Sequence, residues 1–378
     1  MLFQIIIYYL IKSVHNTLNT IKIATIVGAR PQFIKAAVIS RQIRLLKGVS
    51  EVLIHTGQHY NANMSDIFFN ELDIRTPDYH LGIGGGSHGQ NTGKMLELIE
   101  KVLVKERPDW VLVYGDTDST LAGALAACKL HIPIAHVEAG LRSFNRRMPE
   151  EINRVLTDHS SSLLFAPTVT AVNNLDLEGI KGNKVYLSGD VMYDAMLFYK
   201  FKFRKPVILS QISQGFLLCT IHRAENTDDL SRMAAIVRFI NHLSETWRVI
   251  LPMHPRTMEA LRSMANVVKL STTVHVIDPV SYFEMNWLLE NCSAVITDSG
   301  GLQKEAYFHL KPCLTLRDET EWVELVTAGY NLLASPFEKD LLNRFHKFIQ
   351  IKIPSSDEIY GNGNAGKAIV EKLTNRTI

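Results

Sequence analysis

Short, strongly apolar segments recur along this 378-residue chain, and each ends in glycine or polar residues before a helical pattern begins. Expected strands in the first half lie at residues 23–27, 52–55, 110–114, 132–137, 163–165 and 185–187, and those in the second half at 216–221, 249–253, 274–277, 294–297 and 313–316. Strands that alternate with helices through short loops form parallel sheets covered by helices on both faces. The pattern therefore predicts an α/β fold.

The length of the chain favours more than one domain, because single cores rarely grow to this size. The composition changes after Asp194, where a stretch without clear periodicity begins. We expect an N-terminal extension (1–20), a Rossmann-like domain with acid–base residues (21–194), a linker (195–214), a second Rossmann-like domain (215–360) and a C-terminal helix (361–378) that can return to the first domain. Two doubly wound Rossmann-like domains facing a cleft would suit a nucleotide-linked substrate.

Composition excludes several other classes of protein. With 46% hydrophobic and 21% charged residues and a formal net charge of +2, the chain is globular and carries no bulk charge for nucleic acid or an anionic membrane. The apolar segment 2–11 is shorter than the ~20 residues that span a bilayer and lacks the features of a signal peptide. The four cysteines are far apart and lie in apolar runs, which predicts buried free thiols and a cytoplasmic location.

Two strand-to-helix turns have the composition of anion-binding corners. In the first, Gly28-Ala29-Arg30-Pro31, a helix N-terminus offers N–H groups while Arg30 and Lys35 add positive charge. It lacks the G-x-G-x-x-G pattern, so no dinucleotide fingerprint is present.

The second corner, Asp298-Ser299-Gly300-Gly301, opens another helix, and Glu305 one turn later is placed to accept hydrogen bonds from ribose hydroxyls. Taken alone, this segment is about equally well explained as a structural turn.

Candidate acid–base groups follow other strand ends. Glu138 comes just after a strand and Glu150 lies in the first turn of a helix, within an arginine-rich stretch that also contains Glu151; a solvated, salt-bridged loop is the alternative explanation. Asp116 and His222 complete the set, which suits proton abstraction at carbon rather than nucleophilic hydrolysis. Asp116-Thr-Asp118 could instead be a metal site, but no cluster with metal-ligand spacing accompanies it, so we predict no metal.

Seven motifs together resemble the non-hydrolysing UDP-N-acetylglucosamine 2-epimerases, which have the GT-B fold. In chain order they are Gly28-Ala-Arg-Pro31 with Lys35, Gly115-Asp116-Thr117, His136-Val-Glu-Ala-Gly-Leu-Arg142, Met148-Pro-Glu-Glu-Ile-Asn-Arg154, His222-Arg-Ala-Glu-Asn226, Asp298-Ser-Gly-Gly-Leu-Gln303 with Glu305, and Arg317-Asp-Glu-Thr-Glu321. Each motif is weak by itself, whereas all seven in the family's order are highly specific.

The resemblance implies an isomerase that removes the C2 proton, eliminates UDP and adds it back after reprotonation on the other face. No cofactor is implied, and a homodimer in surface polysaccharide synthesis is expected. The implied acid–base residues are Asp116, Glu138 and Glu150, with His222 near the diphosphate. The implied substrate-binding residues are Arg30, Lys35, Arg142, Ser299, Gly300, Gly301, Glu305 and Arg317.

The expected substrate is UDP-N-acetylglucosamine, converted to UDP-N-acetylmannosamine. Departures from the commonest family pattern at Gln32 and at Trp322-Val323 resemble instead the branch that epimerises UDP-2,3-diacetamido-2,3-dideoxyglucuronate in O-antigen assembly, and Trp322 could reshape the sugar pocket. These departures also put in doubt the allosteric site known in some family members. The rival functions are a GT-B glycosyltransferase, a UDP-sugar sensor and a hydrolysing epimerase.

Overall fold

The computed structural model describes residues 20–58, 71–212, 215–351, 353 and 358–375 of the chain. The apolar segment 2–11 therefore lies outside the described residues. The chain divides into two compact units: residues 1–142, 146–194 and 361–378 form the first, and residues 143–145 and 195–360 form the second. Across the described ranges, no helix is long and apolar enough to cross a membrane.

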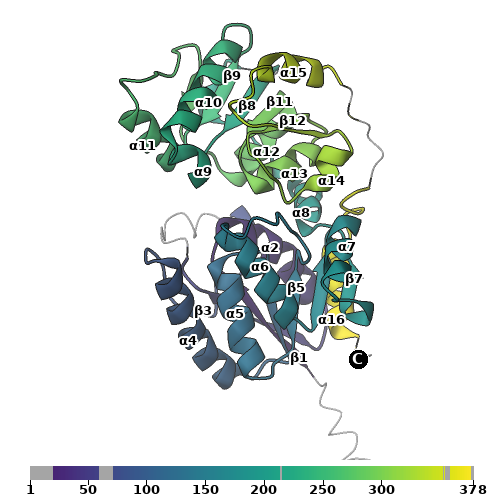
Figure 1. Ribbon diagram of the computed structural model, residues 1–378. Coiled ribbons are helices and arrows are strands. Elements are labelled where there is room, and N and C mark those ends of the chain that lie inside the picture. The colour runs from purple at the N-terminus through teal and green to yellow at the C-terminus, as the bar shows by residue number, and fades with distance from the viewer. Residues whose placement is uncertain (1–19, 59–70, 213–214, 352, 354–357, 376–378) are drawn as a thin grey trace, which may run out of the picture. The chain divides into compact units, whose positions relative to one another are not determined.

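The first unit contains a seven-stranded, wholly parallel sheet in the order β3-β2-β1-β4-β5-β6-β7 (Figure 1). Its strands are β1 Ile21–Val27, β2 Val49–His55, β3 Tyr79–His80, β4 Trp110–Tyr114, β5 Ile134–Val137, β6 Leu163–Ala166 and β7 Val185–Leu187. The strands read as nearly continuous apolar runs because helices cover both faces of the sheet.

The helices of the first unit form two layers. They are α2 Arg30–Arg44, α4 His88–Glu106, α5 Asp118–Lys129, α6 Pro149–Ser160, α7 Val169–Leu177, the start of α8 Val191–Tyr199, and α16 Ala365–Thr374, with a 3₁₀ turn η1 at Gly182–Lys184. Helices α4, α5 and α6 lie side by side, whereas α16 packs beside α2 (Figure 1). Right-handed crossovers that leave β1 and β4 in opposite directions place these two groups on opposite faces.

The second unit repeats this architecture with a six-stranded parallel sheet in the order β10-β9-β8-β11-β12-β13. Its strands are β8 Phe216–Thr220, β9 Val249–Pro252, β10 His275–Ile277, β11 Cys292–Thr297, β12 Cys313–Thr315 and β13 Asn331–Leu333. Its helices are α9 Ala224–Thr227, α10 Leu230–Leu243, α11 Pro255–Ser263, α12 Tyr282–Asn291, α13 Gly300–Phe308, α14 Val323–Thr327 and α15 Leu341–Phe348, preceded by 3₁₀ turns η2 Lys200–Lys202 and η3 Val207–Leu209. One apolar cluster lies on each face of the sheet.

The predicted fold class, two Rossmann-like units with parallel sheets, is confirmed. One detail of the prediction is wrong. Cys128 is exposed rather than buried, although all four cysteines are free.

In both sheets, the order in which successive strands are added changes side between the two central strands. Chain connections leave to one side of β1 and to the other side of β4 in the first unit, and the same holds for β8 and β11 in the second. In open α/β sheets, ligands bind outside the carboxyl ends of the strands at this reversal. The segments that follow these strands are therefore the places to look for a site.

Candidate active site

The first corner is closed by Gln32, which joins the carboxyl ends of β1 and β4. Its Oε1 accepts hydrogen bonds from the backbone nitrogens of Gly28 and Ala29 at 2.8 and 3.0 Å, and its Nε2 donates to the Tyr114 carbonyl at 2.9 Å. Gly28 is required here because a Cβ atom would come within 2.1 Å of Ser119 Oγ. Two backbone N–H groups that could have held an anion are thus occupied by a side chain of the protein.

Lys35, expected in the same corner, forms an ion pair with the carboxylate of Glu138. Both side chains are almost fully buried, with 7% and 10% of their surfaces exposed. Gly115 lies beside this pair in a left-handed conformation (φ +62°), where a Cβ would approach Lys35 Nζ to 3.3 Å. The structure therefore links the predicted binding residue Lys35 to the predicted acid–base residue Glu138.

Glu138 itself has an unusual backbone conformation. Its φ of +75° is uncommon for a residue with a side chain, and its backbone nitrogen and that of Ala139 both donate to the Phe165 carbonyl at 3.1 Å. Such strain persists where the surroundings enforce it and is frequent at functional sites. The loop after β5 thus holds the carboxylate in a direction that an ordinary strand end would not give.

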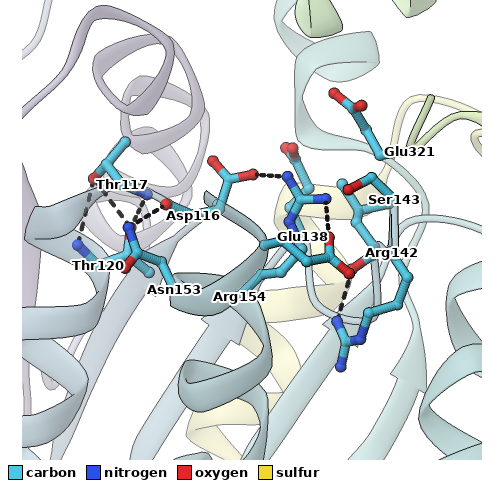
Figure 2. A network of polar contacts seen from close by, with 12 residues as sticks. Asp116, Thr117, Thr120, Glu138, Arg142, Ser143, Asn153, Arg154 and Glu321 are labelled. Carbon is cyan, nitrogen blue, oxygen red and sulfur yellow. Dashed lines mark hydrogen bonds and ion pairs between the residues drawn. The ribbon is translucent and has the colours of Figure 1, made fainter. Parts of the chain in front are cut away.

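Asp116 forms a separate ion pair at the end of the neighbouring strand β4. Its Oδ2 lies 2.5 Å from Nη2 of Arg154 (Figure 2). Nη1 of the same guanidinium lies 3.0 Å from Glu151 Oε2. Arg154 and Glu151 are each only 2% exposed. Glu151, which was not among the predicted site residues, therefore holds the arginine that pairs with Asp116. The spacing of three residues between Glu151 and Arg154 on one helix is the sequence signal that could have indicated this pair.

Glu150, half-buried in the first turn of α6, precedes Glu151 directly. Asn153 from the next turn donates to the Asp116 carbonyl at 2.9 Å (Figure 2). It also donates to Asp118 Oδ1 at 3.2 Å. The structure thus brings Asp116 and Glu138 to neighbouring strand ends and places Glu150 on the helix that follows.

Arg142, expected to bind substrate, is committed to a buried network in this structure. Its Nη1 lies 2.7 Å from Asp158 Oδ2, and its Nε and Nη2 lie 2.7 and 2.8 Å from the two oxygens of Glu178. The guanidinium is 1% exposed. These two carboxylates raise the pKa of Arg142, although burial opposes them, so the charge is permanent.

In the second unit, Asp298 organises the strand end rather than facing outward. It is fully buried, and its carboxylate accepts hydrogen bonds from the backbone nitrogens of His222 at 3.0 Å and Arg223 at 2.9 Å and from Asn226 Nδ2 at 3.1 Å. The ends of β8 and β11 are therefore joined by one carboxylate, which fixes the position of His222.

His222 keeps 34% of its side chain exposed beside that carboxylate. Burial of the ring lowers its pKa below the ordinary value; Asp298 opposes this effect and two nearby arginines add to it. The ring of His254, at the end of β9, lies 5.2 Å away. The neutral imidazole form of His222 is thus favoured at neutral pH.

The two glycines at the start of α13 differ in their surroundings. A Cβ on Gly300 would lie 2.2 Å from Glu321 Oε1, so this position is needed for close packing inside the protein. A Cβ on Gly301 would meet nothing within 4 Å. Open space in front of Gly301 and the N–H groups of a helix start are the features that an anion requires. Ser299, the N-cap, forms no side-chain cap hydrogen bond.

Arg317, the last predicted binding residue of this unit, is 1% exposed and paired inside the protein. Its Nη1 lies 2.9 Å from Glu321 and its Nε lies 3.3 Å from Glu225. Trp322 is also buried, with Lys304 Nζ 4.6 Å from the centre of its ring. Trp322 therefore packs within the second unit.

The remaining predicted residues, Arg30 and Glu305, are both half-buried, at the first residue of α2 and within α13. Their roles stay predictions. Among the residues that the structure describes, no three His, Cys, Asp or Glu side chains gather as a metal ion would require. Asp118, the second carboxylate of the D-x-D pattern, lies 2.8 Å from His88 Nδ1.

Fold and site together define an α/β protein with two carboxylates, each paired with a buried cation, at neighbouring strand ends of one Rossmann-like unit and a glycine-lined helix N-terminus in the other. The model of the UDP-N-acetylglucosamine 2-epimerase family matches residues 41–374, and the chain belongs to this family. It is accordingly a UDP-sugar 2-epimerase, an isomerase.

Individual relatives match over nearly their whole length. UDP-2,3-diacetamido-2,3-dideoxy-D-glucuronate 2-epimerase of Pseudomonas aeruginosa PAO1 is 53% identical over 355 residues, covering 93% of this chain and 99% of that protein. The crystal structure of Methanocaldococcus jannaschii UDP-GlcNAc 2-epimerase with UDP-GlcNAc and UDP has a TM-score of 0.88 at 44% identity, covering 94% and 99%. That of Neisseria meningitidis UDP-GlcNAc 2-epimerase bound to UDP-GlcNAc has a TM-score of 0.83 at 32% identity, covering 93% and 99%.

Proposed function

We propose that the protein inverts C2 of a UDP-2-acetamido sugar without hydrolysis, by eliminating UDP and adding it back. One observation carries the proposal: the carboxylates of Asp116 and Glu138 stand at neighbouring strand ends, each paired with its own buried cation. Separate pairing fixes the position of each carboxylate independently of the other. Inversion at carbon needs two positioned groups, because one removes a proton from one face while another supplies a proton to the opposite face.

The chemistry balances without a cofactor. A base takes the C2 proton, the electrons of that C–H bond form a C1=C2 double bond, and the C1–O bond breaks with its electron pair leaving on UDP. Protonation at C2 on the other face and return of the UDP oxygen to C1 complete the inversion. We assign the proton transfers to Asp116, Glu138 and Glu150.

We assign UDP to the second unit, with His222 beside the diphosphate and Gly301 at the start of α13. The N–H groups of a helix start stabilise the charge that develops on a departing diphosphate. The open space at Gly301 supports this assignment, and Ser299 and Glu305 are the other proposed contacts. Arg30, Arg142 and Arg317 are kept as proposed binding residues; the buried ion pairs of Arg142 and Arg317 make them supports for the site more readily than direct contacts.

Two substrates are supported by the relatives. The 53% identity to the Pseudomonas enzyme favours UDP-2,3-diacetamido-2,3-dideoxy-D-glucuronate, whereas the enzyme of Methanocaldococcus, at 44%, acts on UDP-GlcNAc. A pocket built to pair with the sugar carboxylate should disfavour UDP-GlcNAc by roughly 10²-fold or more in kcat/KM. A side-by-side assay of the two nucleotides therefore decides between them. A cytoplasmic homodimer serving surface polysaccharide synthesis remains part of the proposal.

Incubation in D₂O tests the reaction itself. The protein should place deuterium at C2 of its substrate with no acceptor added, and should release no free sugar. Glu138→Gln should abolish this exchange while UDP still binds. A glycosyltransferase would need an acceptor, a hydrolysing epimerase would release the free sugar, and a sensor would show no exchange. Absence of C2 exchange with both nucleotides would overturn the proposal.

A further inference from the structure

A buried network behind the acid–base carboxylates is centred on Asp158, a fully buried residue of α6. Its Oδ1 lies 2.7 Å from His136 Nδ1. Its Oδ2 accepts hydrogen bonds from Arg142 Nη1 at 2.7 Å and from the backbone nitrogen of Gly140 at 3.1 Å. The other ring nitrogen of His136, Nε2, lies 2.7 Å from the Gly115 carbonyl oxygen. Every contact in this network therefore involves buried groups of the first unit.

The network reaches both strand ends that carry carboxylates. Gly115 directly precedes Asp116 at the end of β4, so the bond from His136 fixes that strand end. His136 and Gly140 stand two residues before and two residues after Glu138, and both contact the same carboxylate. The segment that forces Glu138 into its left-handed conformation is thus held on both sides.

The third carboxylate is tied through the helix that carries it. Asp158 lies two turns after Glu150 in α6, and a helix transmits the position of one turn to the next with little freedom. One buried carboxylate therefore connects the three segments that bear the proposed proton-transfer groups. None of these links was visible in the sequence, because the partners are 16 to 22 residues apart.

The hydrogen-bond geometry also determines the protonation of His136. Its Nε2 faces a carbonyl oxygen, which can only accept. Its Nδ1 faces Asp158 Oδ1, and the other oxygen of Asp158 accepts hydrogen bonds from the Arg142 guanidinium and from the Gly140 nitrogen, which favours the ionised carboxylate. Both ring nitrogens must then donate, so the ring carries two protons and a positive charge.

Charge balance requires one further proton in this network. Arg142 contributes one positive charge, and Asp158 and Glu178 contribute two negative charges. One proton more than the neutral imidazole carries brings the sum of these four groups to zero, which burial favours, and the hydrogen-bond geometry places that proton on His136. His159, whose Nε2 lies 3.1 Å from Glu178 at the edge of the network, keeps about half of its side chain exposed.

We propose that Asp158 is a positioning residue for the epimerisation, acting through a doubly protonated His136 to hold Asp116 and Glu138 in register. The inference rests on the proposed function, in which Asp116 and Glu138 are the proton-transfer groups that must be positioned. An amide cannot take the place of this carboxylate, because the Asp158→Asn side chain has a single acceptor oxygen for three donors and turns its NH₂ toward one of them. The freed strand ends would shift, and displacements of about 1 Å in an active site cost about 10²-fold in rate.

The protonation of His136 can be observed directly. In protein labelled with ¹⁵N only at its 14 histidines, His136 should show two ring N–H signals. The signals are assigned by their absence from a His136→Gln variant. A single ring N–H for His136 would overturn the inference, and this measurement needs neither substrate nor a variant with activity.

Asp158→Asn then tests the positioning. We expect kcat to fall roughly 10- to 100-fold while the UDP dissociation constant changes less than about twofold, because UDP is assigned to the other unit. One of the two His136 ring N–H signals should disappear in the same variant. Retention of wild-type kcat would refute the positioning role, as would an equal loss of kcat and of UDP binding, which indicates general unfolding.

An aspartate-to-asparagine substitution at an exposed position serves as the control. Asp176→Asn, on the exposed surface of α7 beside Lys181, should leave kcat and the His136 signals unchanged. If Asp158→Asn does not fold, His136→Gln is read by the same kinetic split, with the same outcomes. If wild-type protein shows no C2 exchange, the proposed function fails, while the ring N–H signals still decide the state of His136.

Discussion

The Gly301→Ala variant distinguishes the effect of an added side chain on the stability of the free protein from its effect on ligand binding. Gly301 is the second residue of α13 and is exposed, and an added Cβ would meet no atom within 4 Å. Replacing glycine by alanine in a helix gains about 0.5–1 kcal/mol, because the unfolded chain loses freedom. The free variant should therefore unfold at a urea concentration equal to or higher than wild type.

Binding of UDP should move in the opposite direction. If the diphosphate lies against the N-terminus of α13, the new methyl group occupies space that the ligand needs. A weakening of at least about tenfold in the UDP dissociation constant corresponds to about 1.4 kcal/mol. Opposite changes in stability and affinity from one methyl group would locate the ligand at Gly301.

Gly300→Ala provides the contrast in the adjacent residue. Its Cβ would lie 2.2 Å from Glu321 Oε1 and push this carboxylate away from Arg317 Nη1, now 2.9 Å from its other oxygen. Loss of a hydrogen bond between charged groups costs about 1.5–3 kcal/mol. Gly300→Ala should therefore lose stability without any ligand present.

Isothermal titration with UDP and urea unfolding without UDP give the two quantities. Wild-type UDP affinity in Gly301→Ala would refute the assignment of the diphosphate to this helix. A loss of stability in free Gly301→Ala would refute the reasoning from open space, whatever the affinity.

Two further predictions concern the first unit. Burial raises the pKa of Glu51 above its ordinary value of 4.5, so the stability it contributes is complete below about that pH and is lost as pH rises through the raised value. Glu51→Gln keeps an acceptor for Thr25 and Ser40, so its stability relative to wild type should increase between pH 5 and pH 8; urea curves that differ equally at both values would contradict this. Gly140 has a φ of +81°, and a Cβ added there would lie 2.3 Å from the Ala171 carbonyl oxygen. Gly140→Ala should therefore lower the free energy of unfolding in urea by about 2–4 kcal/mol and also reduce C2 exchange. A loss of stability below about 1 kcal/mol would show that the loop adapts.

The sequence predicted the strand ends well because apolar runs and glycine turns are local signals. Asp116, Glu138 and Asp298 all follow the strands expected for them. The two-residue strand β3 and the three-residue strand β13 were missed, since such short segments carry no period of their own. Their pairing comes from the sheet beside them.

The partners of charged side chains could not be predicted from the sequence. Arg142 pairs with Glu178, 36 residues away, and nothing local to either residue indicates that contact. Asp298 was expected to cradle a ligand, whereas it binds backbone nitrogens of a segment 76 residues earlier. Residue types at strand ends thus predict where chemistry is placed, but tertiary structure decides which charges face a ligand and which support the others.

Because α16 belongs to the first unit, the first unit is completed after the strands of the second unit have been synthesised. Gly366 of α16 packs against Val38 of α2, and its backbone nitrogen donates to Asp194 at 2.8 Å. Domains generally fold as units while the ribosome still elongates the chain. Here the first unit lacks one of its helices until α16 has been synthesised, whereas the strands of the second unit all precede α16 in the chain. Nascent protein should therefore keep an unprotected α2 surface that a chaperone can recognise until α16 emerges.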